Sequence, residues 1–130
     1  MMKHITIDGN RFDDIVGFYA EINRVFMAGE EWQLGQSLDA FNDLLYGSYG
    51  ALKGADCVRL HWIAIGKSRD DLGVQCTLNW LAAKLNSPGP FNLDLINAQM
   101  DALKRGEGET FYQIVLSILA DHPKIELVAS

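Results

Sequence analysis

One stretch near the middle of the chain decides the fold: Cys57-Val58-Arg59-Leu60-His61-Trp62-Ile63-Ala64-Ile65. It is rich in β-branched and aromatic residues, and the apolar residues Val58, Leu60 and Trp62 alternate along it. Gly54 and Gly66 bound it on either side. Alternation of this kind between turn residues predicts a β-strand.

Two further stretches of alternating polar and apolar residues lie close to the ends of the chain. Residues 3–7 alternate and run into the turn residues Asp8 and Gly9, and residues 124–128 alternate after His122-Pro123. Each of them predicts a short strand. The alternation also indicates that only one face of the sheet is well covered, unlike most parallel sheets.

Segments with helical spacing of apolar residues separate these strands. One helix is predicted to follow Asp13 as its N-cap and to stop at Gly29, and a second is predicted between Ser37 and Gly47. The second presents one apolar stripe, which consists of Leu38, Phe41, Leu44 and Leu45. The last helix opens with the form of a capping box, Thr110-Phe111-Tyr112-Gln113.

Residues 73–109 contain two less regular helical patterns. The first carries Leu78, Leu81, Ala82 and Leu85 and breaks at residues 86–90, and the second carries Ile96, Met100 and Leu103 and closes at Gly106. Strands separated by helices favour parallel pairing through right-handed crossovers. The whole pattern predicts a single α/β domain over residues 1–130, with a small three-stranded parallel sheet flanked by helices.

The composition is that of a globular protein, with 48% hydrophobic and 22% charged residues in a chain long enough for one core. No apolar run approaches the roughly 18 residues of a membrane span, and residues 1–8 lack the apolar region of a secretory signal. The two cysteines, Cys57 and Cys76, are too few for a disulfide scaffold. We therefore expect a soluble, cytoplasmic protein with free thiols and no membrane partner.

Negative charge is concentrated in one window of the sequence. The net charge is −6, and no lysine or arginine lies between Arg24 and Lys53. The acidic residues of this window are Glu30, Glu31, Asp39 and Asp43. Such a field repels nucleic acid and attracts cationic surfaces. We therefore expect a basic protein partner and no nucleic acid, although short acidic stretches also occur on surfaces that bind nothing.

The same window contains an ordered motif, Leu34-Gly35-Gln36-Ser37-Leu38-Asp39-Ala40-Phe41-Asn42-Asp43-Leu44-Leu45, followed by Tyr46-Gly47-Ser48-Tyr49-Gly50. It resembles the inhibitory helix and loop of the barstar family, in which a glycine and a polar spacer precede Leu-Asp-Ala, an aromatic residue, Asp and an apolar residue. The resemblance extends over residues 3–72 and 110–130, because the order of strands and helices is similar there. Residues 73–109 look like a helical insertion, to which we assign no role.

The resemblance implies an intracellular inhibitor of a secreted, guanyl-specific ribonuclease of the barnase type, or of a related basic nuclease toxin, and implies neither catalysis nor a cofactor or metal. Asp43 matches the family acid that enters the phosphate-binding site of the nuclease, and Asp39 matches the second acid facing the enzyme. The implied partner-binding residues are Gln33, Gly35, Ser37, Leu38, Asp39, Asn42, Asp43, Tyr46, Gly47 and Ser117.

Three of these positions depart from the family pattern. Gln33, beside Trp32, stands where the family has a tyrosine that reaches into the nuclease. Asn42 stands in place of a tryptophan, and Ser117 in place of an acid, with Asp121 one turn further on. These departures leave the target enzyme undefined and retain the acidic helix.

Other functions compete with inhibition. Asp39 and Asp43, four residues apart on one helical face, have Cβ atoms about 6 Å apart, which suits a small hydrolase only in a concave site that nothing in the sequence supplies. A regulatory binding domain that inhibits nothing would keep the same acidic helix, and a solvated helix face is the simplest interpretation of the acids alone. Tyr46 and Tyr49 suit either interface anchors or packing over the sheet.

Spacing excludes further chemistry. Gly66-Lys67-Ser68 lacks the P-loop glycine, because His61 stands five residues before Gly66. Cys57 and His61 lie about 13 Å apart along a strand, too far for a shared metal or a direct hydrogen bond. His4 and His122 are isolated in sequence and receive no chemical role, although an imidazolium at His122 would suit a helix end.

Overall fold

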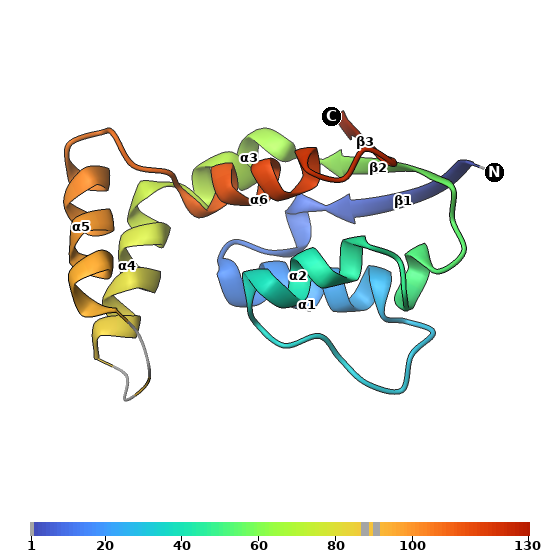
Figure 1. Cartoon of the computed structure of the whole chain (residues 1–130). Helices are drawn as coiled ribbons and strands as arrows, with labels where there is room; N and C mark the ends of the chain where they lie inside the picture. Colours follow the sequence, from blue (N-terminus) through green and yellow to red (C-terminus); the bar gives the residue numbers. More distant parts are fainter. Residues whose placement is uncertain (1, 87–88, 90–91) are drawn as a thin grey trace.

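The computed structural model describes residues 2–86, 89 and 92–130. The three predicted strands are present as β1 (Met2–Asp8), β2 (Cys57–Ile63) and β3 (Ile125–Ala129). They form one sheet in the order β1-β2-β3, and both pairs of strands are parallel (Figure 1). The predicted α/β class with a three-stranded parallel sheet is therefore confirmed.

The central strand β2 places its alternating apolar residues toward the helices. Leu60 is in register with Ile5 of β1 and Leu127 of β3, and it is 1% exposed. On the opposite face, Arg59 and Glu126 remain accessible and form an ion pair of 3.1 Å. The sheet thus has one covered face and one open face, as the alternation of residues predicted.

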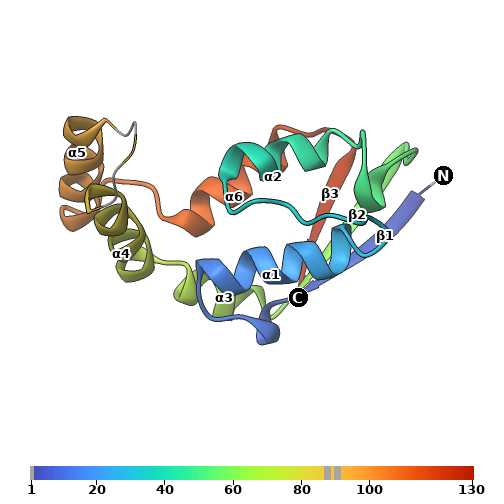
Figure 2. The same cartoon turned by 90° about the horizontal axis from the view of Figure 1, so that it is seen from below.

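Three helices cover the buried face: α1 (Ile15–Phe26), α2 (Leu38–Leu45) and α6 (Phe111–Ala120) (Figure 2). Aromatic rings join them. Phe18 of α1 lies 5.7 Å from Phe41 of α2, 5.7 Å from Phe111 of α6 and 6.2 Å from Trp62 of β2, measured between ring centroids. Because all four side chains are at most 1% exposed, these rings form the centre of the core. Two 3-10 turns, η1 (Gly9–Arg11) and η2 (Gly50–Leu52), precede α1 and β2.

The helix ends follow the predicted signals with two exceptions. Helix α1 ends at Phe26, with Met27 as its C-cap, rather than at the predicted Gly29. Ser37 and Thr110 are the N-caps of α2 and α6, and Thr110 forms the predicted capping box. The prediction of Asp13 as the N-cap of α1 is wrong. The Asp14 carboxylate accepts a 2.7 Å hydrogen bond from the Gly17 N–H, and Asp14 has the extended backbone that an N-cap adopts.

A short helix that we did not predict, α3 (Ile65–Asp71), follows β2 directly. The strand ends at Ile63, and Ala64 turns the chain with a φ of +55°. Ser68 of α3 is fully buried and accepts a 3.0 Å hydrogen bond from Nε1 of Trp62. This bond satisfies the polar atom of the largest core side chain and fixes α3 beneath the end of β2.

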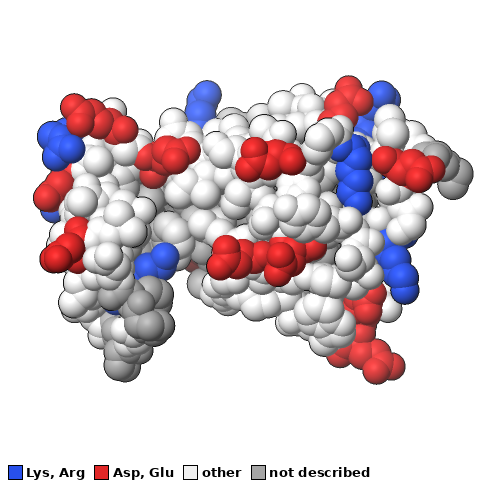
Figure 3. Space-filling model, in the orientation of Figure 1, with Lys and Arg blue, Asp and Glu red and all other residues white. Residues whose placement is uncertain are grey.

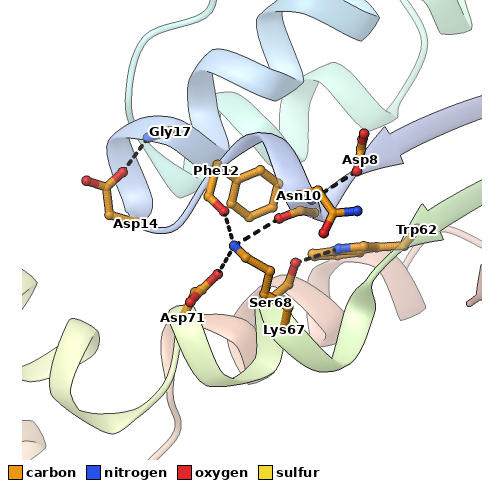
Figure 4. A network of polar contacts seen from close by, with 10 residues as sticks. Asp8, Asn10, Phe12, Asp14, Gly17, Trp62, Lys67, Ser68 and Asp71 are labelled. Carbon is orange, nitrogen blue, oxygen red and sulfur yellow. Dashed lines mark hydrogen bonds and ion pairs between the residues drawn. The ribbon is translucent and has the colours of Figure 1, made fainter.

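Lys67 ties α3 to the beginning of α1. Its Nζ donates to the carbonyl oxygens of Gly9 and Phe12 at 3.3 and 2.7 Å and forms an ion pair of 2.5 Å with Asp71 (Figure 4). Helix α3 approaches residue 9 so closely that only glycine fits there, because a Cβ on Gly9 would lie 2.6 Å from Oγ of Ser68. Lys67 and Ser68 therefore serve the fold rather than a phosphate site.

Helices α4 (Val74–Leu85) and α5 (Leu93–Lys104) form a hairpin that projects from the rest of the molecule (Figure 1). Leu81, Ile96 and Leu103 bury a small cluster of their own. Trp80 connects this cluster to the main core, with its ring 5.2 Å from that of Phe111. The predicted break at residues 86–90 lies partly outside the described residues.

Candidate protein-binding site

Helix α2 is held at both ends and along its inner side. The Ser37 hydroxyl accepts a 3.0 Å hydrogen bond from the Ala40 N–H. After the last turn, Gly47 has a φ of +85°, a left-handed conformation that glycine adopts without strain. The residues that anchor the helix in the core, each at most 1% exposed, are Phe41, Leu44 and Leu45. The outer side of α2 therefore faces solvent from a fixed position.

Asp39 and Asp43 lie on this outer side, and both are exposed. In the described part of the chain, neither carboxylate has a lysine or arginine within ion-pair distance. Figure 3 shows acidic side chains spread across this face of the molecule. The predicted exposed acid pair is confirmed. Leu38, which we expected to be buried beneath the pair, is only half-buried, because it is the first helical residue and packs at the edge of the core.

The loop between α1 and α2 lies beside the acids. Asn23 holds this loop, since its side chain accepts a 2.6 Å hydrogen bond from the Leu34 N–H and donates to the Leu34 carbonyl at 3.2 Å. Trp32 is 47% exposed and packs against Tyr49, with ring centroids 4.9 Å apart. Burial and the negative charge of Asp43 raise the pKa of Tyr49. The loop, Tyr49 and the acidic side of α2 thus form one surface.

A hollow of about 530 Å³ opens beside the same loop. The loop residues that line it are Glu30, Glu31, Trp32 and Gln33. The Glu30 carboxylate accepts a 3.0 Å hydrogen bond from the Gly50 N–H, which closes the loop onto η2. Gln33 is therefore presented from an anchored loop.

The middle and the C-terminal end of α2 contact residues that follow α6. Nε2 of the buried His122 lies 2.7 Å from Oδ1 of Asn42. Tyr46, 65% exposed, meets the His122 ring edge-on at 4.7 Å, and Nζ of Lys124 donates to the Tyr46 carbonyl at 3.0 Å. Burial lowers the pKa of His122; the charge of Asp121 opposes this shift and that of Lys124 adds to it. The neutral ring is favoured, contrary to the imidazolium considered from the sequence.

The predicted partner-binding residues thus fall on neighbouring elements. Gln33 and Gly35 are exposed in the loop, and Ser117 is exposed on α6, which packs against α2. The remaining residues belong to α2 and its two ends: Ser37, Leu38, Asp39, Asn42, Asp43, Tyr46 and Gly47. Asn42 differs from the others because its side chain already has a partner in His122.

The chain matches no protein-family model, no curated protein and no solved structure. The resemblance to the barstar family therefore rests on the motif and on the order of elements. In the part of the chain that the structure describes, no helix has the length and apolar character needed to cross a membrane. Within the same residues, no group of three or more His, Cys, Asp or Glu side chains is arranged to hold a metal ion.

Sequence reasoning missed two histidine contacts. His122 contacts Asn42, 80 residues away, and Nδ1 of His4 lies 3.0 Å from Nε2 of His61, with the rings stacked at 5.3 Å. The register places Thr6 opposite His61, so His4 is a diagonal neighbour on the open face of the sheet. The alternation of each strand already showed which face each histidine occupies. Only the register, which the sequence does not state, shows that they meet.

Proposed function

We propose that this protein is a barstar-like inhibitor of a basic ribonuclease, which it blocks with the exposed acids of α2 and the loops on either side. The observation that carries the proposal is the exposure of Asp39 and Asp43 without a cationic partner among the described residues. Both carboxylates are exposed one turn apart, without an ion-pairing lysine or arginine among the described residues. Two like charges at this spacing repel by a few tenths of a kcal/mol in the free protein. A cationic partner removes that cost.

Electrostatics supports a basic partner in particular. The window between Arg24 and Lys53, which contains α2, has four acidic residues and no basic one. A surface of one sign speeds the encounter with a surface of the opposite sign. The substrate-binding site of a ribonuclease is positively charged, because it must hold phosphate groups. Asp43 is the proposed anchor at the phosphate-binding position, and Asp39 is the second acid facing the enzyme.

The preorganisation of α2 in the free protein supports tight binding. The helix is capped by Ser37, closed by Gly47 and joined to α6 through Asn42 and His122. A binding element that is ordered before association loses less conformational entropy in the complex. Tyr46 and Trp32, which are 65% and 47% exposed, supply aromatic area in the segments that follow and precede α2.

The geometry gives less support to a hydrolase that uses the two aspartates. Paired catalytic carboxylates need a concave site that controls water. Two hollows, of about 530 and 600 Å³, are lined by other residues. A regulatory binding domain without inhibition keeps the acidic surface, and only an enzyme assay separates it from an inhibitor.

The test is inhibition of a purified guanyl-specific ribonuclease of the barnase type. We expect the native chain to inhibit RNA cleavage and Asp43→Asn to weaken binding by more than about 2 kcal/mol, as for a charged hot spot. The matched control is Asp101→Asn, since Asp101 is also an exposed acid in the body of a helix but lies on α5. Denaturant unfolding should show both variants within about 0.5 kcal/mol of the native chain. Binding without inhibition would favour the regulatory domain, and equal affinity of the Asp43 variant would contradict the proposed anchor.

A further inference from the structure

Two histidines meet on the open face of the sheet, which is the face opposite to the helices. His4 lies on β1 and His61 on the neighbouring strand β2, and Figure 1 shows these strands side by side. Nδ1 of His4 lies 3.0 Å from Nε2 of His61. Parallel pairing with β2 runs over the whole of β1, from residue 2 to residue 8. The backbone beneath the two rings is therefore fixed.

Both rings are accessible, and neither is engaged by a third residue. His4 is exposed and His61 is half-buried. Within the described part of the chain, the hydrogen-bond contact of each ring is with the other ring alone. His122 differs from them, because it is buried and contacts Asn42. The nitrogens of His4 and His61 can therefore take up a ligand from solvent without disturbing the core.

The distance between the two nitrogens suits a shared metal ion. An imidazole nitrogen binds Zn²⁺ at about 2.0–2.1 Å. Two such bonds at angles of about 90–109°, as in square-planar and tetrahedral coordination, place the nitrogens about 2.9–3.4 Å apart. The observed 3.0 Å lies within this range. Rotation of the rings about their own side-chain bonds can thus direct both lone pairs at one ion, with the strands left in place.

Metal binding also changes the position of one proton. In the free pair, one of the two facing nitrogens carries a proton and the other accepts it in a hydrogen bond. An ion needs the lone pair of both facing nitrogens. The proton must therefore move to the other nitrogen of the same ring, which leaves both imidazoles neutral, the form that binds metals.

The positive side chains next to the pair already have partners. Arg59 is in register with His4, and its guanidinium forms an ion pair of 3.1 Å with Glu126 on β3. Lys3 precedes His4, but successive residues of a strand point to opposite faces, and its Nζ donates to the Ala51 carbonyl. A cation bound by the two rings therefore lies near an arginine whose charge is compensated.

We propose that His4 and His61 form a surface site for a divalent transition-metal ion of the kind that imidazole prefers: Ni²⁺, Cu²⁺ or Zn²⁺. The rings supply two ligands and water supplies the others, because no third His, Cys, Asp or Glu of the described residues completes the group. Mg²⁺ and Ca²⁺, which take oxygen ligands, do not compete. The ion joins β1 to β2 and so stabilises the folded chain. This inference does not depend on the proposed function.

The first experiment is calorimetric titration of the full chain with Ni²⁺ at pH 7.5. We expect one ion per chain. Loss of even an outer partner of a metal ligand weakens binding 10–100-fold, so loss of a ligand in His4→Gln or in His61→Gln should each weaken it at least about tenfold. Cys57→Ser, which removes another exposed donor of β2, is the control and should bind as the native chain does. Absence of binding, an effect of only one histidine, or equal loss in the control would overturn the proposal.

The second experiment locates the ion by ¹⁵N NMR of the imidazoles with Zn²⁺, which is diamagnetic. We expect shifts at Nδ1 of His4 and Nε2 of His61 and none at His122. Ni²⁺ should raise the urea midpoint of the native chain and leave that of both glutamine variants unchanged. Without metal, the variants should unfold close to the native midpoint, which shows that they are folded. Shifts at Nε2 of His4 and Nδ1 of His61 instead would mean that the rings bind separate ions, and the shared site would be refuted.

Discussion

Nε2 of His122 donates a hydrogen bond to Oδ1 of Asn42 across 2.7 Å, and this bond joins the end of α6 to the middle of α2. A carbonyl oxygen can only accept, so the proton is on Nε2. The ring is buried, and Tyr46 covers it edge-on. Nε2 keeps its proton when the ring becomes an imidazolium, so burial, rather than loss of this bond, disfavours the protonated ring.

We predict that protonation of His122 destabilises the fold. Its pKa in the folded protein lies below the unfolded value of about 6.5, so the unfolded chain binds the proton more readily. The stability that the neutral ring contributes is complete above pH 6.5 and decreases as the pH falls below it toward the folded-state pKa. The measurement is urea unfolding between pH 7.5 and 5.5. The decrease should be smaller in His122→Gln, and an identical pH profile in that variant would contradict the assignment.

Asn42→Asp should reverse this dependence. A carboxylate at the acceptor position attracts the imidazolium and raises the pKa of His122. A group whose pKa is raised on folding contributes stability below its unfolded value and loses it as the pH rises through the folded value. The variant should therefore gain stability relative to the native chain between pH 7.5 and 5.5. Asn42→Ala, which leaves the ring without an acceptor, should cost about 1 kcal/mol at pH 7.5.

Glu21 is the most buried acid of the described residues, and we predict that its charge stabilises the fold. It is 3% exposed, accepts a 2.8 Å hydrogen bond from the Asp8 N–H, and pairs with Arg24 and Arg11 at 2.7 and 3.2 Å. Burial raises its pKa, but the hydrogen bonds from Arg24 and Asp8 and the charges of both arginines outweigh burial and hold the pKa below 4.5. Because both arginines are about half exposed and regain water, Glu21→Gln should cost about 1–2 kcal/mol at pH 7.

The pH dependence provides the check on Glu21. A lowered carboxyl pKa contributes stability that is complete above pH 4.5 and is lost as the pH falls through the folded-state value. The difference in unfolding free energy between the native chain and Glu21→Gln should therefore shrink in acid. A difference that stays constant from pH 7 to pH 3 would show that packing, rather than charge, determines the cost.

Salt should affect the rate of association with the ribonuclease more than the rate of dissociation. The acidic window steers a basic partner over distances that salt screens, since the Debye length falls from about 10 Å at 0.1 M to about 3 Å at 1 M. Stopped-flow mixing across this range measures both rates. An association rate that ignores salt would exclude electrostatic steering by this surface.

Thiol-modifying reagents of opposite charge should distinguish the two cysteines. In the Cys57→Ser variant, a cationic methanethiosulfonate should modify Cys76 faster than an anionic one, because Asp14 and Asp71 act on this thiol. In the Cys76→Ser variant, the exposed Cys57 provides the comparison and should show a smaller preference. Taking the ratio of two reagents at one thiol removes the effect of its pKa. Equal ratios at both cysteines would mean that Asp14 and Asp71 create no distinctive negative potential at Cys76.

The strands and the acidic helix could be predicted because their signals are local. Alternation at Val58, Leu60 and Trp62 and the cap at Ser37 involve neighbouring residues, whose side-chain directions follow directly from the strand and helix periods. The N-cap of α1 was misplaced by one residue because Asp13 and Asp14 are chemically alike. Helix α3 was missed because its residues continue the apolar pattern of β2 through Ile65.

The sequence by itself determined the three strands, the helices other than α3 and the exposure of Asp39 and Asp43. The tertiary structure alone decided that His122 contacts Asn42, that Lys67 holds the chain before α1, and that α4 faces Asp13 and Asp14 across a groove. These contacts join residues tens of positions apart, so they depend on strand register and on how helices pack. No local periodicity contains that information, because it arises only when the apolar faces are buried together in one core.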